Sequence, residues 1–361
     1  MPTAECSGAA EIAEELKRRI LAGAVRSGEY LSSVRALGHE FGCAPLTAHR
    51  ALKQLAETGL VVAEARHGYR VTGPRPASAA QEVLVAIEDT TGYEGYLGDI
   101  YETQQAVLRR GALARGWISA SLPYTGQPVE VLAKQLQEMR ASALIVQDIG
   151  ERFPPGLLAE LTALGLPAVG LDASCTAPGL DVVMRDEAHG AALAVEYLVK
   201  RGHRRIGWYG PFGTSGNSLR RFAGAAEALV AAGLDLDTRE WRPVPSPTEE
   251  DSAREFLRRP DRPVAVLALW QTAARAVVRA AREMGLKLGR DLDLVGWALE
   301  EHFDSSYSRD CPELRESCAT ATWSMADVGR TVLARIAERR RDPDLPGARI
   351  MLPMKLREPG K

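Results

Sequence analysis

The chain has 361 residues, of which 45% are hydrophobic and 25% charged, and its formal net charge is −2. These proportions are typical of a soluble globular protein, and the length predicts two or three folding units. No apolar run approaches the ~20 residues of a membrane helix, and the polar N-terminus does not resemble a secretion signal. The five cysteines are scattered without a C-x-x-C pair, so we expect a reduced, cytoplasmic protein that contacts no membrane.

Three short helices are predicted near the N-terminus. An apolar stripe at four-residue spacing predicts a first helix over residues 9–22. A serine cap and Gly42 delimit a second helix that ends at about Phe41. Pro45 suits the first turn of a third helix, which extends to about Glu57.

The third helix has an apolar face and a polar face. Four apolar residues share one face: Ala48, Ala51, Leu52 and Leu55. The other face carries Leu46, Arg50, Lys53 and Glu57, flanked by Thr47 and His49. Two strands, 60–63 and 69–72, then surround a tip at 66–68. Two helices joined by a glycine-containing turn and followed by a hairpin are the parts of a winged helix-turn-helix, whose recognition helix enters the major groove of DNA.

Beyond residue 73 the sequence changes character. Residues 74–81 are rich in Pro, Ala and Ser and read as a linker. From residue 82 onward, apolar strand candidates alternate with helical stretches, which predicts parallel sheets covered by helices. About 280 residues are generous for one such sheet, so we expect an α/β domain with two lobes.

The first 73 residues resemble the winged-helix domain of the GntR family of bacterial regulators. The residues that carry this resemblance are 19–23, 31–35, 47, 50–52, 59–61 and 68. The resemblance implies that DNA is contacted from the second helix, the third helix and the wing tip, by Arg35, Thr47, His49, Arg50, Lys53, Arg66, His67 and Gly68. Pro45 and His49 replace two arginines that are usual in this family, so the operator sequence cannot be borrowed from a relative.

Residues 82–358 resemble the effector domain of the LacI/GalR family, which is itself similar to periplasmic sugar-binding proteins. The segments that carry this resemblance are 194–207, 221–224, 262–268, 294–297 and 350–353. The combination is similar to arabinose-responsive regulators. It implies a winged helix over residues 1–73, the linker, and a sensor over residues 82–361 whose chain crosses between the lobes near 185, 299 and 325.

The resemblance also implies an effector site, at which this sequence departs from its relatives. Asp172 and Arg221 match ligand-contacting positions, whereas Trp270-Gln271 replaces an Asn-Asp pair. Ala298 follows Trp297 where an acidic residue is usual, and Trp323 stands in place of a glutamine. The expected effector residues are Asp172, Arg221, Trp270, Gln271, Trp297 and Trp323. Because a polyhydroxylated ligand would lose hydrogen bonds here, a larger glycoside or a more apolar ligand is favoured over a free monosaccharide.

Simpler interpretations exist for most of these residues. Surface arginines and lysines are usually solvated, Arg221 could bridge an acidic side chain, and Asp172 could cap a turn. The tryptophans could belong to the core, and His203 could make a structural hydrogen bond. Cys311 and Cys318 lack a histidine at zinc spacing, and no catalytic triad or paired carboxylates stand out, so we expect no metal, cofactor or catalytic residue.

We therefore expect a homodimeric, sequence-specific regulator of transcription, acting as a repressor on a pseudo-palindromic operator and controlled by a small molecule. One alternative is a regulator whose sensor has lost its ligand and serves for dimerisation or partner binding. A remoter alternative is a solute-binding protein or a dinucleotide-dependent enzyme, since glycines 210, 213 and 216 follow a strand, although not at G-x-G-x-x-G spacing.

Overall fold

The computed structural model describes most of the chain. The described residues are 8–21, 25, 29–57, 60–64, 68–71, 82–88, 96–147, 153–171, 180–210, 215–236, 250–268 and 270–360. The chain divides into two compact units, Met1–Leu84 with Leu108–Ser119, and Val85–Val107 with Ala120–Lys361. The predicted linker at residues 74–81 lies outside the described residues. Within the described ranges, no helix is long and apolar enough to cross a membrane.

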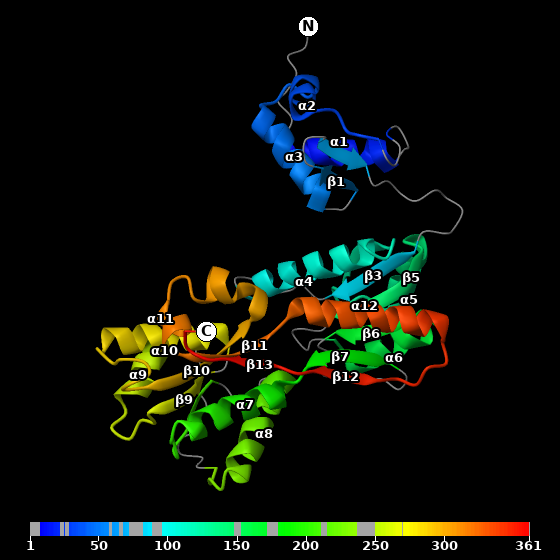
Figure 1. Ribbon diagram of the computed structural model, residues 1–361. Coiled ribbons are helices and arrows are strands. Elements are labelled where there is room, and N and C mark those ends of the chain that lie inside the picture. The colour runs from blue at the N-terminus through cyan, green and yellow to red at the C-terminus, as the bar shows by residue number, and fades with distance from the viewer. Residues whose placement is uncertain are drawn as a thin grey trace. The chain divides into compact units, whose positions relative to one another are not determined.

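The N-terminal region forms three helices and a hairpin (Figure 1). Their bounds are α1 (Ala9–Leu21), α2 (Val34–Glu40), α3 (Pro45–Glu57), β1 (Val61–Glu64) and β2 (Gly68–Val71). The side-chain oxygen of Ser33 caps α2 by accepting from the Ala36 N–H at 3.2 Å. Gly42 adopts a φ of 61° in the turn before α3, a conformation that favours glycine. The sequence therefore predicted this region to within one or two residues at each boundary.

The core of this region is the apolar face predicted for α1 and α3. Ile12 and Ile20 of α1 are fully buried, as are Ala48 and Ala51 of α3. Because this stripe packs inward, the opposite side of α3 faces solvent. The hairpin has a third partner, since Tyr30 forms an antiparallel bridge to β2.

A six-stranded sheet has the order β12-β7-β6-β5-β3-β4. Its strands and associated helices are β3 (Val83–Glu88), α4 (Tyr96–Leu113), β4 (Ile118–Pro123), α5 (Val129–Glu138), β5 (Ala141–Gln147), α6 (Pro155–Ala163), β6 (Ala168–Leu171), β7 (Asp181–Arg185), α12 (Met325–Arg341) and β12 (Arg349–Leu352). The pairs β5–β6, β6–β7 and β7–β12 are parallel. All residues of β6 and β7 are buried, as expected for strands covered on both faces.

A five-stranded sheet has the order β13-β11-β10-β9-β8. Its elements are α7 (Glu187–Lys200), β8 (Gly207–Tyr209), α8 (Gly216–Ala231), α9 (Glu250–Arg258), β9 (Ala265–Ala268), α10 (Gln271–Glu283), β10 (Asp293–Leu299), the short helices Glu300–His302, Phe303–Tyr307 and α11 (Glu313–Glu316), then β11 (Ala319–Trp323) and β13 (Lys355–Arg357). Strands β8 to β11 are parallel to their neighbours, and β13 is antiparallel to β11.

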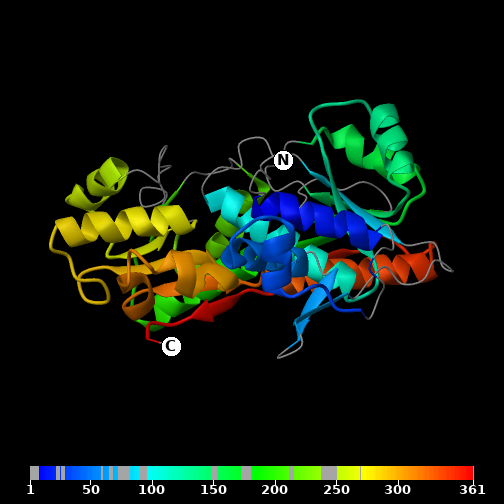
Figure 2. The same ribbon diagram turned by 90° about the horizontal axis from the view of Figure 1, so that it is seen from above.

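The chain passes between the two sheets three times. It leaves the six-stranded sheet after β7, returns through α12, which contacts β6 and β7, and goes back from β12 to β13. Figures 1 and 2 show α12 as the long orange-red helix beside that sheet. The crossing predicted near residue 299 is wrong, because β10 and β11 are parallel neighbours in one sheet. The sequence also did not predict the crossing between β12 and β13, because such short strands carry little periodic signal.

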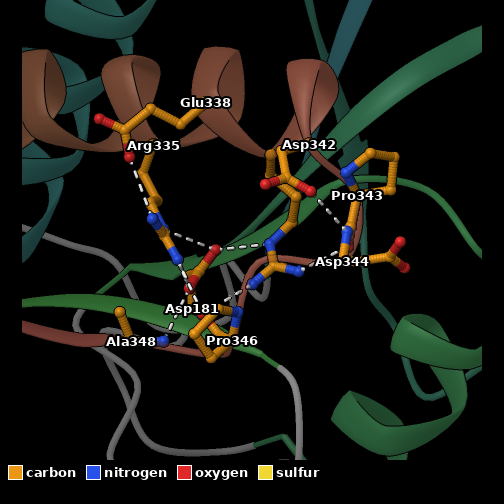
Figure 3. A network of polar contacts seen from close by, with 9 residues as sticks. Asp181, Arg335, Glu338, Asp342, Pro343, Asp344, Pro346 and Ala348 are labelled. Atoms are coloured by element: carbon orange, nitrogen blue, oxygen red, sulfur yellow. Dashed lines mark hydrogen bonds and ion pairs between the residues drawn. The ribbon is translucent and has the colours of Figure 1, made fainter.

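A buried carboxylate fixes the return from α12 to β12 (Figure 3). Asp181, the first residue of β7, is fully buried and accepts from Arg339 Nε at 2.6 Å and Arg335 Nη2 at 3.0 Å. It also accepts from the Ala348 N–H at 2.8 Å, and Arg335 donates to the Pro346 carbonyl at 2.8 Å. The two guanidinium groups therefore tie α12 and the connection that follows it to the start of β7.

Candidate nucleic-acid interface and effector site

Helix α3 carries four of the eight predicted DNA contacts. His49, Arg50 and Lys53 are exposed, and Thr47 is half-buried in the first turn. That turn contains no acidic residue. Because the N–H groups at a helix N-terminus carry partial positive charge, this end of α3 favours an anion such as a phosphate.

Ion pairing divides the basic residues of the N-terminal region into two groups. One group is bound to neighbouring acids: Lys17 to Glu14, Arg18 and Arg19 to Glu15, and Arg70 to Glu64, at 2.6–3.0 Å. The other group, Arg35, Arg50 and Lys53, is exposed and forms no hydrogen bond or ion pair with the side chains that the structure describes, which do not include that of Glu57, one turn after Lys53. Exposed cations of this kind can neutralise phosphates.

Of the predicted contacts in the wing, the structure describes only Gly68. Gly68 opens β2 with a φ of 97°, and a Cβ atom there would meet nothing within 4 Å. Arg66 and His67 of the predicted tip lie outside the described residues. The imidazole of His49 lies against the edge of Tyr69, with ring centroids 6.4 Å apart, which places the third helix beside the second wing strand.

In the α/β domain, Arg221 contacts a carboxylate that the sequence did not single out. The Arg221 guanidinium donates to Glu187 through Nε at 2.7 Å and through Nη2 at 3.1 Å. Arg185, the last residue of β7, lies 3.1 Å from the same carboxylate. Glu187 is fully buried, and Arg221 is only 3% exposed. The interpretation of Arg221 as the partner of an acidic side chain is therefore confirmed, but the pair is buried instead of lying on a helix surface.

Two of the predicted tryptophans stack on this group. Arg221 lies over the ring of Trp297 at 4.2 Å, and Arg185 lies over the ring of Trp323 at 4.1 Å. Both indoles are 4% exposed. Cation–π stacking thus occupies one face of each ring, which leaves less aromatic surface for a sugar than the sequence suggested.

The charge state of Glu187 follows from its neighbours. Burial alone would raise the pKa of Glu187, but the guanidinium groups of Arg221 and Arg185 lower that pKa by more, so the net shift is downward. The carboxylate therefore stays ionised at neutral pH and holds Arg221 in one orientation.

Several buried polar atoms of the α/β domain have no hydrogen-bond partner among the residues that the structure describes. Arg221 Nη1 and Trp297 Nε1 are unpaired donors, and Gln271 Oε1 is an unpaired acceptor. Both amide atoms of Gln104 and Gln147, each 1% exposed, are also unpaired. Unsatisfied buried groups are costly and rare in native proteins, and an absent ligand or water is an ordinary explanation for them.

The sequence did not identify Gln104 and Gln147, although one signal was available. Gln147 ends the apolar strand β5, and Glu88 ends β3 in the same way, where it accepts from Tyr101 and Gln105 at 2.5–2.6 Å. A polar residue that closes a buried parallel strand points to the edge where α/β sheets bind ligands.

Trp270 and Asp172 complete the predicted effector set. Trp270 has a φ of 76° and a ψ of 150°, a region that bulky side chains rarely adopt, immediately before Gln271. Such strain is more frequent at functional sites than elsewhere. Asp172 lies outside the described residues.

Among the other sequence interpretations, the structural role of His203 is confirmed, since its Nε2 lies 2.5 Å from Asp293 Oδ2.

Two segments match known families. Residues 9–71 match the bacterial regulatory proteins of the gntR family, and residues 195–358 match the periplasmic binding protein-like domain. Relatives in sequence include the HTH-type transcriptional repressors PurR of Shigella dysenteriae and Escherichia coli, 28% identical over 227 residues. The matched region covers 60% of this chain and 58% of the length of each relative.

Solved structures share the fold. A regulatory protein of the LacI family from Chloroflexus aggregans has a TM-score of 0.65 and 21% identity, over 76% of this chain and 96% of that one. The transcriptional regulator CelR in complex with cellobiose has a TM-score of 0.59 and 19% identity, over 99% of both chains. The fold is thus that of a helix-turn-helix region followed by an α/β domain with two sheets. The chain joins a GntR-type helix-turn-helix domain to a periplasmic-binding-protein-like domain.

Proposed function

We propose that this chain is a sequence-specific DNA-binding regulator of transcription, acting as a homodimeric repressor in the cytoplasm. The observation that carries the proposal is the exposed face of α3, where Arg50 and Lys53 form no ion pair with the described side chains while neighbouring cations are paired. Uncompensated cations beside a helix N-terminus suit the phosphate backbone, and a dimer would place two such helices on half-sites of a pseudo-palindrome.

Binding of the full-length chain to duplex DNA at increasing salt tests this proposal. We expect Arg50→Ala with Lys53→Ala to weaken binding by at least tenfold and to reduce the salt slope by about two, one for each lost phosphate contact. Arg18→Ala is the matched control, because Arg18 is exposed but paired with Glu15. Equal effects of the control and the double variant would contradict the assignment of this face.

We further propose that a small molecule bound in the sensor controls DNA binding. The unpaired atoms of Arg221, Gln271 and Trp297, together with Gln104 and Gln147, support a ligand with several hydrogen-bonding groups. In this proposal, Gln104 and Gln147 supply hydrogen bonds in place of those that the tryptophan substitutions remove. Since CelR was solved with cellobiose, a disaccharide is a reasonable first probe.

A thermal-shift screen of sugars, glycosides and nucleosides tests the effector. A ligand at one hundred times its Kd stabilises the native state by about 2.7 kcal/mol, which raises the Tm by several degrees. The same ligand should change the affinity for DNA, because the two binding equilibria are linked. Silence across all three classes would favour the alternative in which the sensor serves dimerisation or partner binding.

A further inference from the structure

An apolar side chain stands among the cations of the recognition helix. Leu46 is 60% exposed, more than any other large apolar side chain described up to residue 71. The other leucines of α3, Leu52 and Leu55, are each 1% exposed and belong to the core. Leu46 therefore contributes little to the packing of this region. A single exposed leucine is ordinary on a protein surface, so it is the position of Leu46 on the helix that carries the argument.

The position of Leu46 relates it to the phosphate-neutralising side chains. Leu46 precedes Arg50 by one helical turn and Lys53 by two, so the three share one stripe of α3. It is the second residue of the helix, and the N-terminal residues of a recognition helix are those that reach base edges. When Arg50 and Lys53 bind the backbone, Leu46 is therefore directed at the major groove.

The chemistry of leucine restricts what it can recognise there. Leucine neither donates nor accepts hydrogen bonds, and the thymine 5-methyl group is the apolar feature of the major-groove edges. Opposite guanine or cytosine, Leu46 would remove water from polar atoms without replacing the lost hydrogen bonds. Leucine at this position thus favours thymine by contact and disfavours G·C pairs by desolvation.

We propose that Leu46 is a specificity-determining residue that packs against a thymine methyl group in each half-site of the operator. This inference rests on the proposed DNA-binding function, and it assigns a direct base contact to a residue outside the polar set predicted from the sequence. Apolar readout at the first turn of α3 would replace part of the recognition that the absent arginine at position 45 cannot supply.

Deoxyuridine substitution tests the contact, because it removes only the methyl group. The preferred operator is first selected from random duplexes with the full-length protein, and each thymine is then replaced in turn by deoxyuridine. We expect one position per half-site to lose about fourfold in affinity, the equivalent of ~0.8 kcal/mol for one buried methyl group. In Leu46→Ala, deoxyuridine at that position should have no effect.

A matched control separates this contact from a general loss of apolar surface. Leu219 of α8 is 57% exposed, so Leu219→Ala removes a comparable side chain from the sensor and should keep the wild-type response to deoxyuridine. Since both leucines are exposed, neither variant should change the Tm. A selected operator at which deoxyuridine affects wild type and Leu46→Ala equally would overturn this inference alone. Failure to select any sequence would overturn the proposed function and the inference together.

Discussion

Two arginine–carboxylate groups lie at opposite ends of strand β7, and their environments differ. At the first residue of the strand, Asp181 binds two arginines and a backbone N–H, and those arginines also donate to backbone carbonyls. Just past the last residue, Glu187 binds Arg221, whose Nη1 has no hydrogen-bond partner among the described residues and whose guanidinium stacks on Trp297. Arg335 Nε of the first group also makes no hydrogen bond there, but it lies 3.0 Å from Asp181 Oδ2, whereas no such ion pair is described for Arg221 Nη1.

The difference follows from the direction of the strand. In open α/β sheets, ligands bind beyond the carboxyl ends of parallel strands, while the amino ends meet the connections that close the fold. We therefore propose a structural role for the Asp181 group and a ligand-binding role for the Glu187 group. The following predictions test this distinction, beginning with the largest expected effect.

Removing the charge of Asp181 should have the largest effect on stability. Asp181→Asn leaves the largely buried Arg339 without a carboxylate partner and Arg335 with only the exposed Glu338, and breaking a buried pair in this way costs about 3–5 kcal/mol. We expect urea unfolding to show this loss, with unchanged DNA affinity once the protein is folded. A stable Asp181→Asn protein with altered ligand response would contradict the structural role.

Removing Arg221 should affect ligand binding more than folding. In Arg221→Ala, Glu187 still has Arg185 at 3.1 Å, so we expect a stability loss of only about 1–3 kcal/mol. A sugar or glycoside ligand should raise the Tm of Arg221→Ala by less than it raises the Tm of the wild type. The difference should correspond to an affinity for that ligand that is at least tenfold lower. Arg339→Ala is the matched control from the Asp181 group, and its ligand-induced shift should stay at the wild-type value. The distinction fails if both variants lose the shift.

A small change next to Trp297 should sharpen the comparison. A Cβ atom on Gly190 would lie 2.9 Å from the Trp297 ring and closer still to the flexible Met354 side chain. Gly190→Ala must therefore displace the indole that stacks on Arg221, and we expect a cost of about 1–3 kcal/mol for such overpacking. Quenching of tryptophan fluorescence by iodide should increase in this variant. No change in either the fluorescence or the ligand response would argue against a role for the stacked indole.

Of all these changes, a change of pH near neutrality should have the smallest effect on the free energy of unfolding. Although burial acts to raise both pKa values, the paired guanidinium groups give Asp181 and Glu187 pKa values below the normal range. Each group stabilises the fold above the unfolded pKa, near 4, and this contribution is lost as the pH falls through the folded pKa. Unfolding free energies should thus be flat from pH 7 to about 5 and should fall below that. In Asp181→Asn, the acid-induced fall should be shallower than in wild type.

Local patterns were enough to predict the DNA-facing helix. The bounds of α3 were predicted to the residue, and Ala48, Ala51, Leu52 and Leu55 are all buried as the spacing indicates. A cap, a glycine turn and a helical period depend on neighbours within a few residues, so the sequence carries them directly. The exposed stripe of Arg50 and Lys53 follows from the same period.

The effector site depends on contacts that local patterns do not contain. The sequence indicated Arg221, Trp297 and Trp323 one by one. It did not indicate Glu187, because Glu187 lies 34 positions from Arg221 in sequence and no local pattern connects the two. Nothing in the spacing of these residues shows that one guanidinium lies over each indole. The crossing expected near residue 299 was wrong for the same reason, since strand order is set by packing between distant segments.

The sequence by itself determined the class of each region, the recognition helix and the side of that helix that meets DNA, because these follow from short-range periodicity and capping. Only the tertiary structure decided, for the residues that it describes, which cations are paired with acidic side chains and which polar atoms are buried without partners. Those properties arise when segments far apart in the chain exclude water from the same place, so they are fixed by packing and not by local order.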